Sequence, residues 1–307
     1  MLGLLYLFLT AGALIALVGA AAVLYRLMHP PRRTLAAALA WQLPADPGEL
    51  GLTFTEQHFR LADGSTSPGW VIEGRRRDGP VLIVTHGFGD SRFGAMWWAV
   101  LLLDFASRVA VYDLRGHGDS TAARSRPGMG DVDDLLAVMD QVHGNEPVVL
   151  FGHSLGAGVS IAVAAQHPER VLGVIADGPY RYWSEPIVGL MRLHGWPARL
   201  FVIPAGLILL AAGVPLWRFD RAKLASRLRC PLLVLHGRED PLCPIESARA
   251  IVAAAADATL VEFDGAGHGD LASVDQPRYI DALTTFFDRL ARPAATADEE
   301  EKGLAVS

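Results

Sequence analysis

The run Gly152-His153-Ser154-Leu155-Gly156 constrains the fold of this chain more than any other part of the sequence. It follows a short apolar segment, residues 147–151, and precedes a segment of small residues, 157–166. A strand that turns at once into a helix needs glycines at the turn, because side chains there would collide with the neighbouring strand and helix. Such a turn strains the serine backbone, lifts its hydroxyl clear of the sheet and sets it beside N–H groups at a helix N-terminus. Ser154 is therefore predicted to be a nucleophile, and the alternative is a structural serine that caps the helix.

Strands and helices are predicted to alternate from residue 51 onward. Short apolar segments rich in Val, Ile and Leu recur between segments of helical composition. This alternation is typical of a mostly parallel sheet that helices cover on both faces, so the predicted fold class is α/β. The expected strands are 52–61, 69–73, 80–85, 108–112, 147–151, 171–176, 231–236 and 259–263, and the expected helices are 94–106, 130–143, 157–166, 244–256 and 276–290.

Polar residues follow the predicted strands repeatedly. The carboxyl ends of parallel strands meet at one edge of a sheet, which is where sites form in such folds. We therefore expect several of these side chains to converge. They are His86, Asp113, Ser154, Asp177, Asp240 and His268.

From about residue 52 to 290 the chain resembles the α/β-hydrolase superfamily. The matching residues are His86-Gly87, the run 113–118, the run 152–156, the run 237–240 and Gly267-His268. The order Ser, Asp, His is the order of that family. The resemblance implies an α/β-hydrolase fold with a helical lid, and an activity like that of serine esterases or monoacylglycerol lipases, with no cofactor and no metal. Haloalkane dehalogenases would have aspartate in place of Ser154, so that branch is excluded.

The serine needs a base, because a free hydroxyl is a weak nucleophile near neutral pH. His268 is the candidate, since its glycine-rich loop, residues 265–269, lets the imidazole reach across the sheet edge. Asp240 is expected to accept a hydrogen bond from His268 and to hold its tautomer. Asp177 is the rival acid, because the acid of some lipases follows the sixth strand. The alternatives are a solvated loop histidine and a structural turn aspartate.

By the same resemblance, the backbone N–H groups of Phe88 and Leu155 are expected to form an oxyanion hole. The expected reaction is acyl transfer in two steps, in which Ser154 attacks an ester carbonyl and water then hydrolyses the acyl-enzyme. An amidase or peptidase on the same three residues is an alternative that the sequence does not separate from an esterase. His86 is expected to shape the loop beside the oxyanion hole, His153 to be structural, and Asp113 to be tied to the turn at Arg115.

The N-terminal segment is expected to be a single-pass membrane anchor. Residues 1–25 carry no charged side chain, and about 20 helical residues cross a hydrocarbon core of about 30 Å. Arg26, Arg32 and Arg33 follow the apolar run, which favours a cytoplasmic catalytic domain. A cleaved signal sequence is the alternative. The expected organisation is an anchor at 1–28, a juxtamembrane linker at 29–50, a hydrolase domain at 51–292 and a disordered tail at 293–307.

An insertion at about residues 179–228 is expected to form the lid. It contains an uncharged stretch, residues 200–217, that is long enough to suggest a second membrane span. A single crossing there would place Ser154 on one side of the bilayer and His268 on the other, so an assembled site requires a cap, a re-entrant segment or a segment at the membrane surface. A small transporter subunit would require the crossing.

Charge and cysteines exclude some classes of function. The net charge is −6 and no basic stripe is present, so nucleic acid is not an expected partner. The two cysteines, Cys230 and Cys243, show no metal-ligand spacing. The expected partners are a small ester or lipid substrate and membrane lipid, and the oligomeric state stays open. A non-catalytic membrane-bound binding protein is the remaining alternative, and the presence of Ser154, Asp240 and His268 argues against it.

Overall fold

The apolar segments pair into one eight-stranded sheet in the computed structural model, which describes residues 1–126 and 130–291. The strand order is β1-β2-β4-β3-β5-β6-β7-β8. β2 runs antiparallel to β1 and β4, and the other neighbours are parallel. The strands are β1 (Phe54–Arg60), β2 (Thr66–Glu73), β3 (Val81–Thr85), β4 (Arg108–Tyr112), β5 (Val148–His153), β6 (Val171–Asp177), β7 (Leu232–Gly237) and β8 (Ala258–Phe263).

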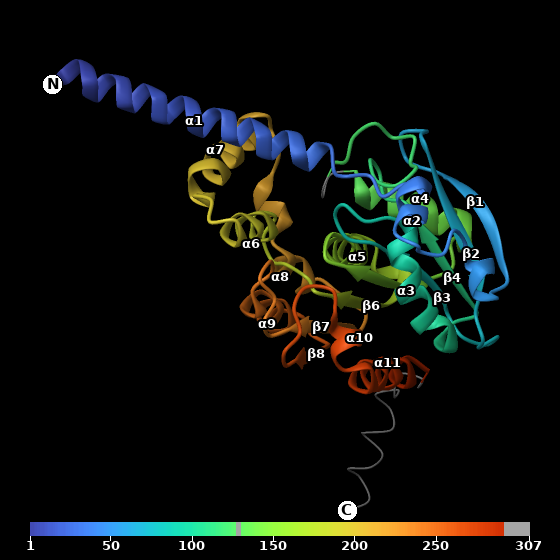
Figure 1. Cartoon of the computed structure of the whole chain (residues 1–307). Helices are drawn as coiled ribbons and strands as arrows, with labels where there is room; N and C mark the ends of the chain where they lie inside the picture. The colour runs from blue at the N-terminus through green and yellow to red at the C-terminus, as the bar shows by residue number, and fades with distance from the viewer. Residues whose placement is uncertain (127–129, 292–307) are drawn as a thin grey trace, which may run out of the picture.

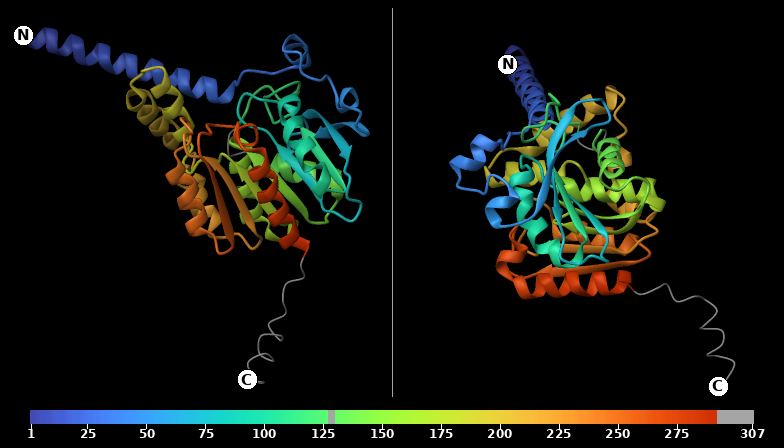
Figure 2. Two further views of the ribbon diagram at one scale, coloured as in Figure 1. Left: turned by 60° about the horizontal axis from the view of Figure 1, so that its bottom comes forward. Right: turned by 90° about the vertical axis from the view of Figure 1, so that its right-hand side faces the viewer.

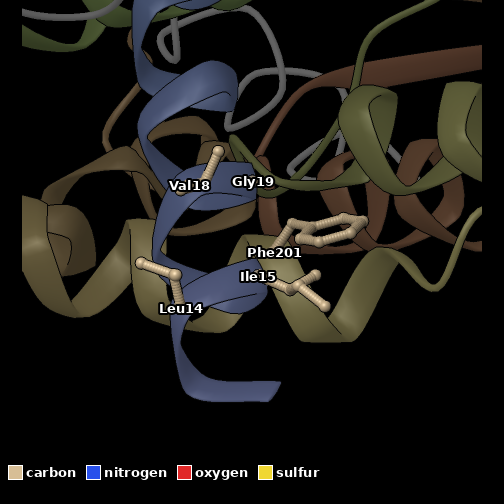
Figure 3. A pocket seen from close by; sticks show the side chains of 5 residues that line it. All are labelled: Leu14, Ile15, Val18, Gly19 and Phe201. Atoms are coloured by element: carbon tan, nitrogen blue, oxygen red, sulfur yellow. The ribbon is translucent and has the colours of Figure 1, made fainter. Parts of the chain in front are cut away.

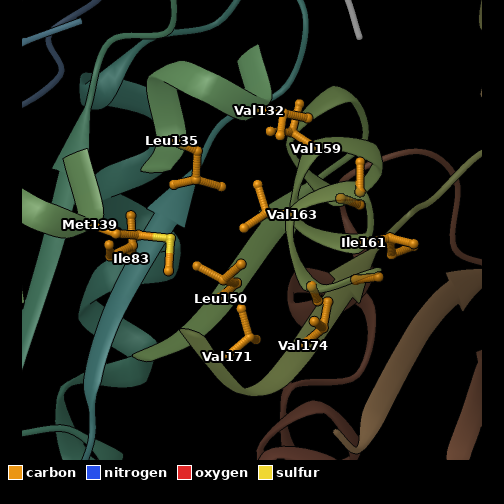
Figure 4. Close-up of a cluster of buried hydrophobic side chains, with 14 of the residues drawn as sticks. Ile83, Val132, Leu135, Met139, Leu150, Val159, Ile161, Val163, Val171 and Val174 are labelled. Carbon is orange, nitrogen blue, oxygen red and sulfur yellow. The ribbon is translucent and has the colours of Figure 1, made fainter. Parts of the chain in front are cut away.

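Helices cover both faces of the sheet, and each face has its own apolar core (Figures 1 and 2). One core, seen in Figure 4, joins strand residues such as Leu150 to helix residues such as Leu135 and Val163. Its helices are α4 (Asp131–His143), α5 (Leu155–Gln166), α8 (Arg221–Ala225) and α9 (Ile245–Ala254). The helices of the other core are α3 (Arg92–Leu102), α10 (Leu271–Val274) and α11 (Gln276–Ala291). Because both faces are covered, the central strands are apolar throughout, without the alternation of a half-exposed sheet.

The N-terminal helix α1 (Leu2–Met28) extends away from the sheet (Figures 1 and 2). Among the described residues it is the one helix long and apolar enough to cross a membrane. The linker after it is tied to the domain. The Arg32 guanidinium donates to the carbonyl oxygens of Ser120 and Ala122, and Arg33 forms an ion pair with Asp90. A short helix, α2 (Leu35–Ala40), then packs through Ala38 into the second core.

The insertion between β6 and β7 is helical. It contains α6 (Glu185–Leu193), α7 (Ala198–Ala211), a 3₁₀ turn (Leu216–Phe219) and α8. A separate small apolar core joins this insertion to α1 through Ala20, Val23, Val202 and Ala205. Residues 200–211 of the uncharged stretch therefore belong to the 14-residue helix α7 beside α1, which is too short to cross a bilayer alone.

The α/β-hydrolase fold predicted from the sequence is confirmed, and each expected strand and helix is present, most of them with shifted ends. The α3 helix ends at Leu102, four residues before the predicted end, and a 3₁₀ turn follows it. Among the strands the largest shift is in β2, which begins at Thr66 although the prediction began at residue 69. The strand begins earlier because residues 66–68 pair with β1, where Thr66 lies opposite Arg60. The connection between β1 and β2 is therefore residues 61–65, which is shorter than the connection at 62–68 that the predicted strand ends imply. The predicted disordered tail, residues 293–307, lies outside the described residues.

Candidate active site

The turn from β5 into α5 holds Ser154 in a left-handed backbone conformation. Its φ is 50° and its ψ is −108°, values that are uncommon for a residue other than glycine. A β-carbon at Gly152 would lie 2.2 Å from the carbonyl carbon of Gly156, and one at Gly156 would lie 2.0 Å from the carbonyl oxygen of Thr85. Neither position has room for a side chain, which is the physical reason for the glycines in the sequence.

Three distant side chains meet at the carboxyl edge of the sheet. His268 Nε2 lies 2.9 Å from Ser154 Oγ, and His268 Nδ1 lies 2.7 Å from Asp240 Oδ2. The carboxylate can only accept, so Nδ1–H donates to Asp240 and Nε2 is left to accept the serine proton. Ser154 is 7% exposed, and the Asp240 side chain is 1% exposed. The chain therefore places a hydroxyl, an imidazole and a carboxylate in one hydrogen-bonded line, largely shielded from water.

Asp240 is held as a carboxylate. The backbone N–H groups of Leu242 and Cys243 donate to its Oδ1 at 2.8 and 2.9 Å. Burial alone would raise the pKa of Asp240, but the hydrogen bond and charge of His268 and the two backbone donors outweigh it, and the pKa lies below its ordinary value. Behind it, the buried His236 donates through Nε2 to the Cys243 carbonyl oxygen at 2.9 Å.

Asp177 is occupied elsewhere. It accepts hydrogen bonds from His153 Nδ1 at 2.9 Å and from the Tyr279 hydroxyl at 2.8 Å. The His153 ring is stacked on Trp98, with ring centroids 4.6 Å apart. The structure therefore brings Asp240 and not Asp177 to His268. Sequence reasoning missed Tyr279 and Trp98 because neither lies in a motif, and Tyr279 is 102 positions from its partner Asp177.

The loop after β3 runs beside the serine. A β-carbon at Gly87 would lie 3.5 Å from Ser154 Cβ, so Phe88 follows within reach of the nucleophile. His86 fixes this loop: its Nδ1 lies 2.7 Å from the Gly87 carbonyl oxygen, and its Nε2 accepts from Leu114 N at 2.9 Å. Burial lowers the pKa of His86 to about 4, so the ring stays neutral. Leu155 begins α5, where the first N–H groups have no partner within the helix.

Asp113 is buried and contacts the end of the Arg115 turn, as expected, but it does not pair with the Arg115 side chain. Asp113 accepts from the Arg92 backbone N–H at 2.7 Å, forms an ion pair with its guanidinium, and accepts from Asp119 N. Arg115 instead forms ion pairs with Asp134 and Asp63. The reason is geometric, because α3 carries Arg92 over one face of the sheet and α4 carries Asp134 over the other.

One group of possible metal ligands overlaps the site. Ligand atoms of Asp240, Cys243 and His268 all lie within 4.8 Å of one another. Both nitrogens of His268 already form hydrogen bonds, to Asp240 and Ser154, and burial raises the pKa of the Cys243 thiol well above its ordinary value. A metal ion would have to displace one hydrogen bond and draw a proton from a disfavoured thiolate, so this donor set fits acid–base chemistry better than metal binding.

Comparison with known families agrees with this fold. The family described as "alpha/beta hydrolase fold" matches residues 80–201, which include the turn at Ser154, and the family described as "TAP-like protein" matches residues 217–299, which include Asp240 and His268. The chain belongs to the α/β-hydrolase superfamily.

Curated proteins resemble the chain at moderate identity. Lysophosphatidylserine lipase ABHD12 of Xenopus tropicalis is 29% identical over 202 residues, which are 62% of this chain and 50% of the relative. An uncharacterized protein of Mycobacterium tuberculosis is 26% identical over 236 residues, which are 75% of this chain and 77% of the relative. The chain therefore spans about half the length of the lipase that it matches.

Solved structures share the α/β-hydrolase fold. The esterase Pf2001 of Pyrococcus furiosus superposes with a TM-score of 0.67 at 19% identity, covering 86% of this chain and 98% of the esterase. A bacterial membrane phospholipase A superposes with a TM-score of 0.60 at 18% identity, covering 95% of this chain and 98% of the phospholipase. At these identities the likeness concerns the fold.

Proposed function

We propose that the chain is a membrane-anchored serine hydrolase that cleaves lipophilic carboxylic esters. The observation that carries the proposal is the line of hydrogen bonds from Ser154 through His268 to Asp240, which the strained turn presents at the sheet edge. A structural serine would need neither a positive φ nor an imidazole acceptor at its hydroxyl. The esterase and lipase names among the similar proteins support an ester over an amide substrate.

In the proposed reaction Ser154 Oγ attacks the ester carbonyl carbon while His268 Nε2 takes the hydroxyl proton. Asp240 stabilises the imidazolium that forms and keeps Nδ1 protonated. The N–H groups of Phe88 and Leu155 would bind the oxyanion, and each such donor contributes about 3 kcal/mol to transition-state stabilisation. His268 then returns the proton to the alkoxide, which leaves as the alcohol. Water, deprotonated by the same nitrogen, hydrolyses the acyl-enzyme and restores Ser154.

The anchor is part of the proposal. Helix α1 has 27 residues, which span about 40 Å at 1.5 Å per residue, more than a hydrocarbon core of about 30 Å. Most of its apolar side chains are exposed and have no cover from the rest of the described chain. Arg26, Arg32 and Arg33 at its carboxyl end favour a catalytic domain on the cytoplasmic side. Retention in the membrane pellet after alkaline carbonate extraction is the expected result, and release into the supernatant would contradict the anchor.

A fluorophosphonate probe tests the chemistry directly, because it bonds covalently to an activated serine. We expect labelling of the wild-type chain and none of Ser154→Ala. Ser160→Ala is the matched control, since Ser160 is a buried serine of helix α5, which Ser154 precedes, and it should not react. A wild-type chain that neither labels nor hydrolyses 4-nitrophenyl butyrate would favour the alternative, a non-catalytic binding protein at the membrane.

A further inference from the structure

Helix α7 of the insertion packs along the carboxyl-terminal third of the anchor helix. The closest approach is at Gly19, where a β-carbon would lie 2.0 Å from Phe201 Cδ1. Ala20 and Ala205 are fully buried in the same contact. Small residues let two helices approach closely, and this composition is typical of helix pairs in membranes. The insertion is therefore fixed to the anchor, as Figures 1 and 3 show.

The outer face of α7 is apolar and unpartnered within the chain. Ile203 and Leu207 are 59% and 61% exposed, and Leu200, Ile208 and Leu210 are partly exposed, at 43%, 37% and 42%. These side chains continue the exposed apolar surface of α1. Water is an unfavourable neighbour for such a surface, because moving apolar side chains from hydrocarbon into water is unfavourable. Because α1 itself is a candidate membrane span, the neighbour available to both helices is the same hydrocarbon.

The amino-terminal end of α7 carries residues that suit the boundary between hydrocarbon and headgroups. Trp196 lies just before the helix, with its side chain 59% exposed, and Arg199 lies in the first turn. A second exposed tryptophan, Trp217, lies in the following 3₁₀ turn and is 65% exposed. Tryptophan and arginine concentrate at this depth, because their apolar parts lie in the hydrocarbon while their polar groups reach water. A helix of 14 residues is about 21 Å long, which is too short to cross the bilayer.

We propose that α7 lies in the acyl-chain region of one leaflet, beside residues 19–27 of α1, so that anchor and lid form a single membrane-embedded surface. Its occupant is the hydrocarbon of membrane lipids. An apolar hollow of about 400 Å³ lies between the two helices, lined by Leu14, Ile15, Val18, Gly19 and Phe201 (Figure 3). A lipid acyl chain fills this hollow. The opposite leaflet is excluded, because α7 contacts the end of α1 that leads into the catalytic domain.

This arrangement links the bilayer to both sides of the candidate active site, and this consequence rests on the proposed function. On one side, α6 of the insertion packs against the loop that follows Asp240. A β-carbon at Gly189 would lie 2.6 Å from Leu242 Cα, two residues after Asp240. On the other side, a β-carbon at Gly89, next to Phe88 of the expected oxyanion hole, would lie 3.5 Å from Pro31 Cδ. A lipid ester can therefore move from the leaflet toward Ser154 between two elements that the anchor fixes.

Spin labels test the depth of α7. Ile203→Cys and Leu207→Cys are labelled in the full-length chain, reconstituted in vesicles of phosphatidylcholine and phosphatidylglycerol. The control is Leu172→Cys, at the start of β6, and the wild-type chain gives the background of its two buried cysteines. We expect labels at 203 and 207 to be accessible to oxygen and protected from a water-soluble nickel complex, and the label at 172 to show the reverse. Equal access of the nickel complex to all three would overturn the proposal, as would dipolar broadening between labels, which would mean that a second copy covers α7.

A pair of glycines in α1 tests the coupling. Gly19→Leu must push α7 away, whereas Gly12→Leu is the matched control because nothing lies within 4 Å of a β-carbon there. We expect Gly19→Leu to lower turnover of a long-chain monoacylglycerol in vesicles by about tenfold or more, because the lid no longer positions the substrate. Turnover of water-soluble 4-nitrophenyl butyrate should be unchanged. Combining Gly19→Leu with Phe201→Ala makes room for the added side chain and should restore most of the activity.

The outcomes separate the two proposals. If wild-type chain hydrolyses neither ester, the proposed function fails, and the spin labels still decide the position of α7. If Gly19→Leu and Gly12→Leu behave alike on the long-chain ester, or if Gly19→Leu slows both esters equally, the lid is not coupled to the anchor and this inference is wrong.

Discussion

Asp177 accepts a hydrogen bond from His153, and the ring centroid of His153 lies 5.0 Å from that of His268, which is bonded to Asp240. Two histidine–aspartate pairs thus lie side by side, and only one of them faces the serine. His153 instead packs on Trp98 and shares Asp177 with Tyr279. The second pair is a buried scaffold for the sheet edge, and its neighbour is the candidate for catalysis.

The two pairs predict different consequences for the same substitution. Asp240→Asn removes the charge that stabilises the imidazolium and presents His268 with the wrong tautomer, so kcat should fall by about 10⁴-fold. Asp177→Asn keeps an acceptor for Tyr279 and should lower kcat by no more than about tenfold, with its main effect on stability. Steady-state hydrolysis of 4-nitrophenyl butyrate measures both. A larger kcat loss in Asp177→Asn would show that the acid has been assigned to the wrong residue.

The glycines of the turn should be intolerant of even a methyl group. Gly156→Ala would place a β-carbon 2.0 Å from the Thr85 carbonyl oxygen, so the α5 helix must shift or the strand must distort. We expect a loss of about 3 kcal/mol or more in the free energy of unfolding, measured by urea denaturation. Gly206→Ala is the control, since a β-carbon there meets its nearest neighbour at 3.4 Å. Similar stability of the two variants would contradict the crowding at the turn.

The ion pairs of Arg115 should contribute to stability and not to chemistry. Its guanidinium contacts Asp134, whose side chain is fully buried, and Asp63 at the surface. Arg115→Met leaves the Asp134 carboxylate buried without its partner, at an expected cost of about 3–5 kcal/mol. The double variant with Asp134→Leu should recover much of that loss. Fluorophosphonate labelling of the folded variants should be unchanged, and loss of labelling without unfolding would point to a direct role in the site.

Buried histidines predict that the chain loses stability as the pH falls below about 6.5. Burial lowers the pKa of His86 to about 4 and of His117 to about 3, and it also lowers the pKa of His236. The unfolded chain takes up these protons near the ordinary histidine value while the folded chain does not, so unfolding becomes easier at lower pH. Asp113 opposes this by one proton, because burial raises its pKa to about 6. His86 and His117 account for about two protons and Asp113 subtracts about one, so these three groups give about 1.4 kcal/mol per pH unit near pH 5, and His236 adds to this in the same direction.

Urea unfolding at a series of pH values between 7 and 4.5 measures this slope. His86→Gln retains an acceptor for the Leu114 N–H and removes one titrating group, so its slope should be smaller by about one proton. Stability that is flat or that increases as the pH falls would mean that these rings are protonated in the folded chain.

The local sequence determined most of the fold. The central strands are runs of Val, Ile and Leu without alternation of apolar and polar residues, because both faces of the sheet are covered. Each of these strands could therefore be predicted from its own sequence. The run from Gly152 to Gly156 determined the strained turn, since steric exclusion at two glycines is a property of adjacent residues. The order of the polar residues after the strands indicated where Ser154, Asp240 and His268 would meet, because parallel strands end at one edge.

Tertiary structure alone decided which groups pair. Asp177 and Asp240 follow adjacent strands, and only the packing of Tyr279 and Trp98 turns His153 toward the first and leaves the second to His268. Asp113 and Arg115 are two residues apart, yet they face helices on opposite sides of the sheet. The contact between Gly19 and Phe201 joins segments separated by most of the chain. Such partners depend on how helices pack on a sheet, and no local pattern of residues encodes that packing.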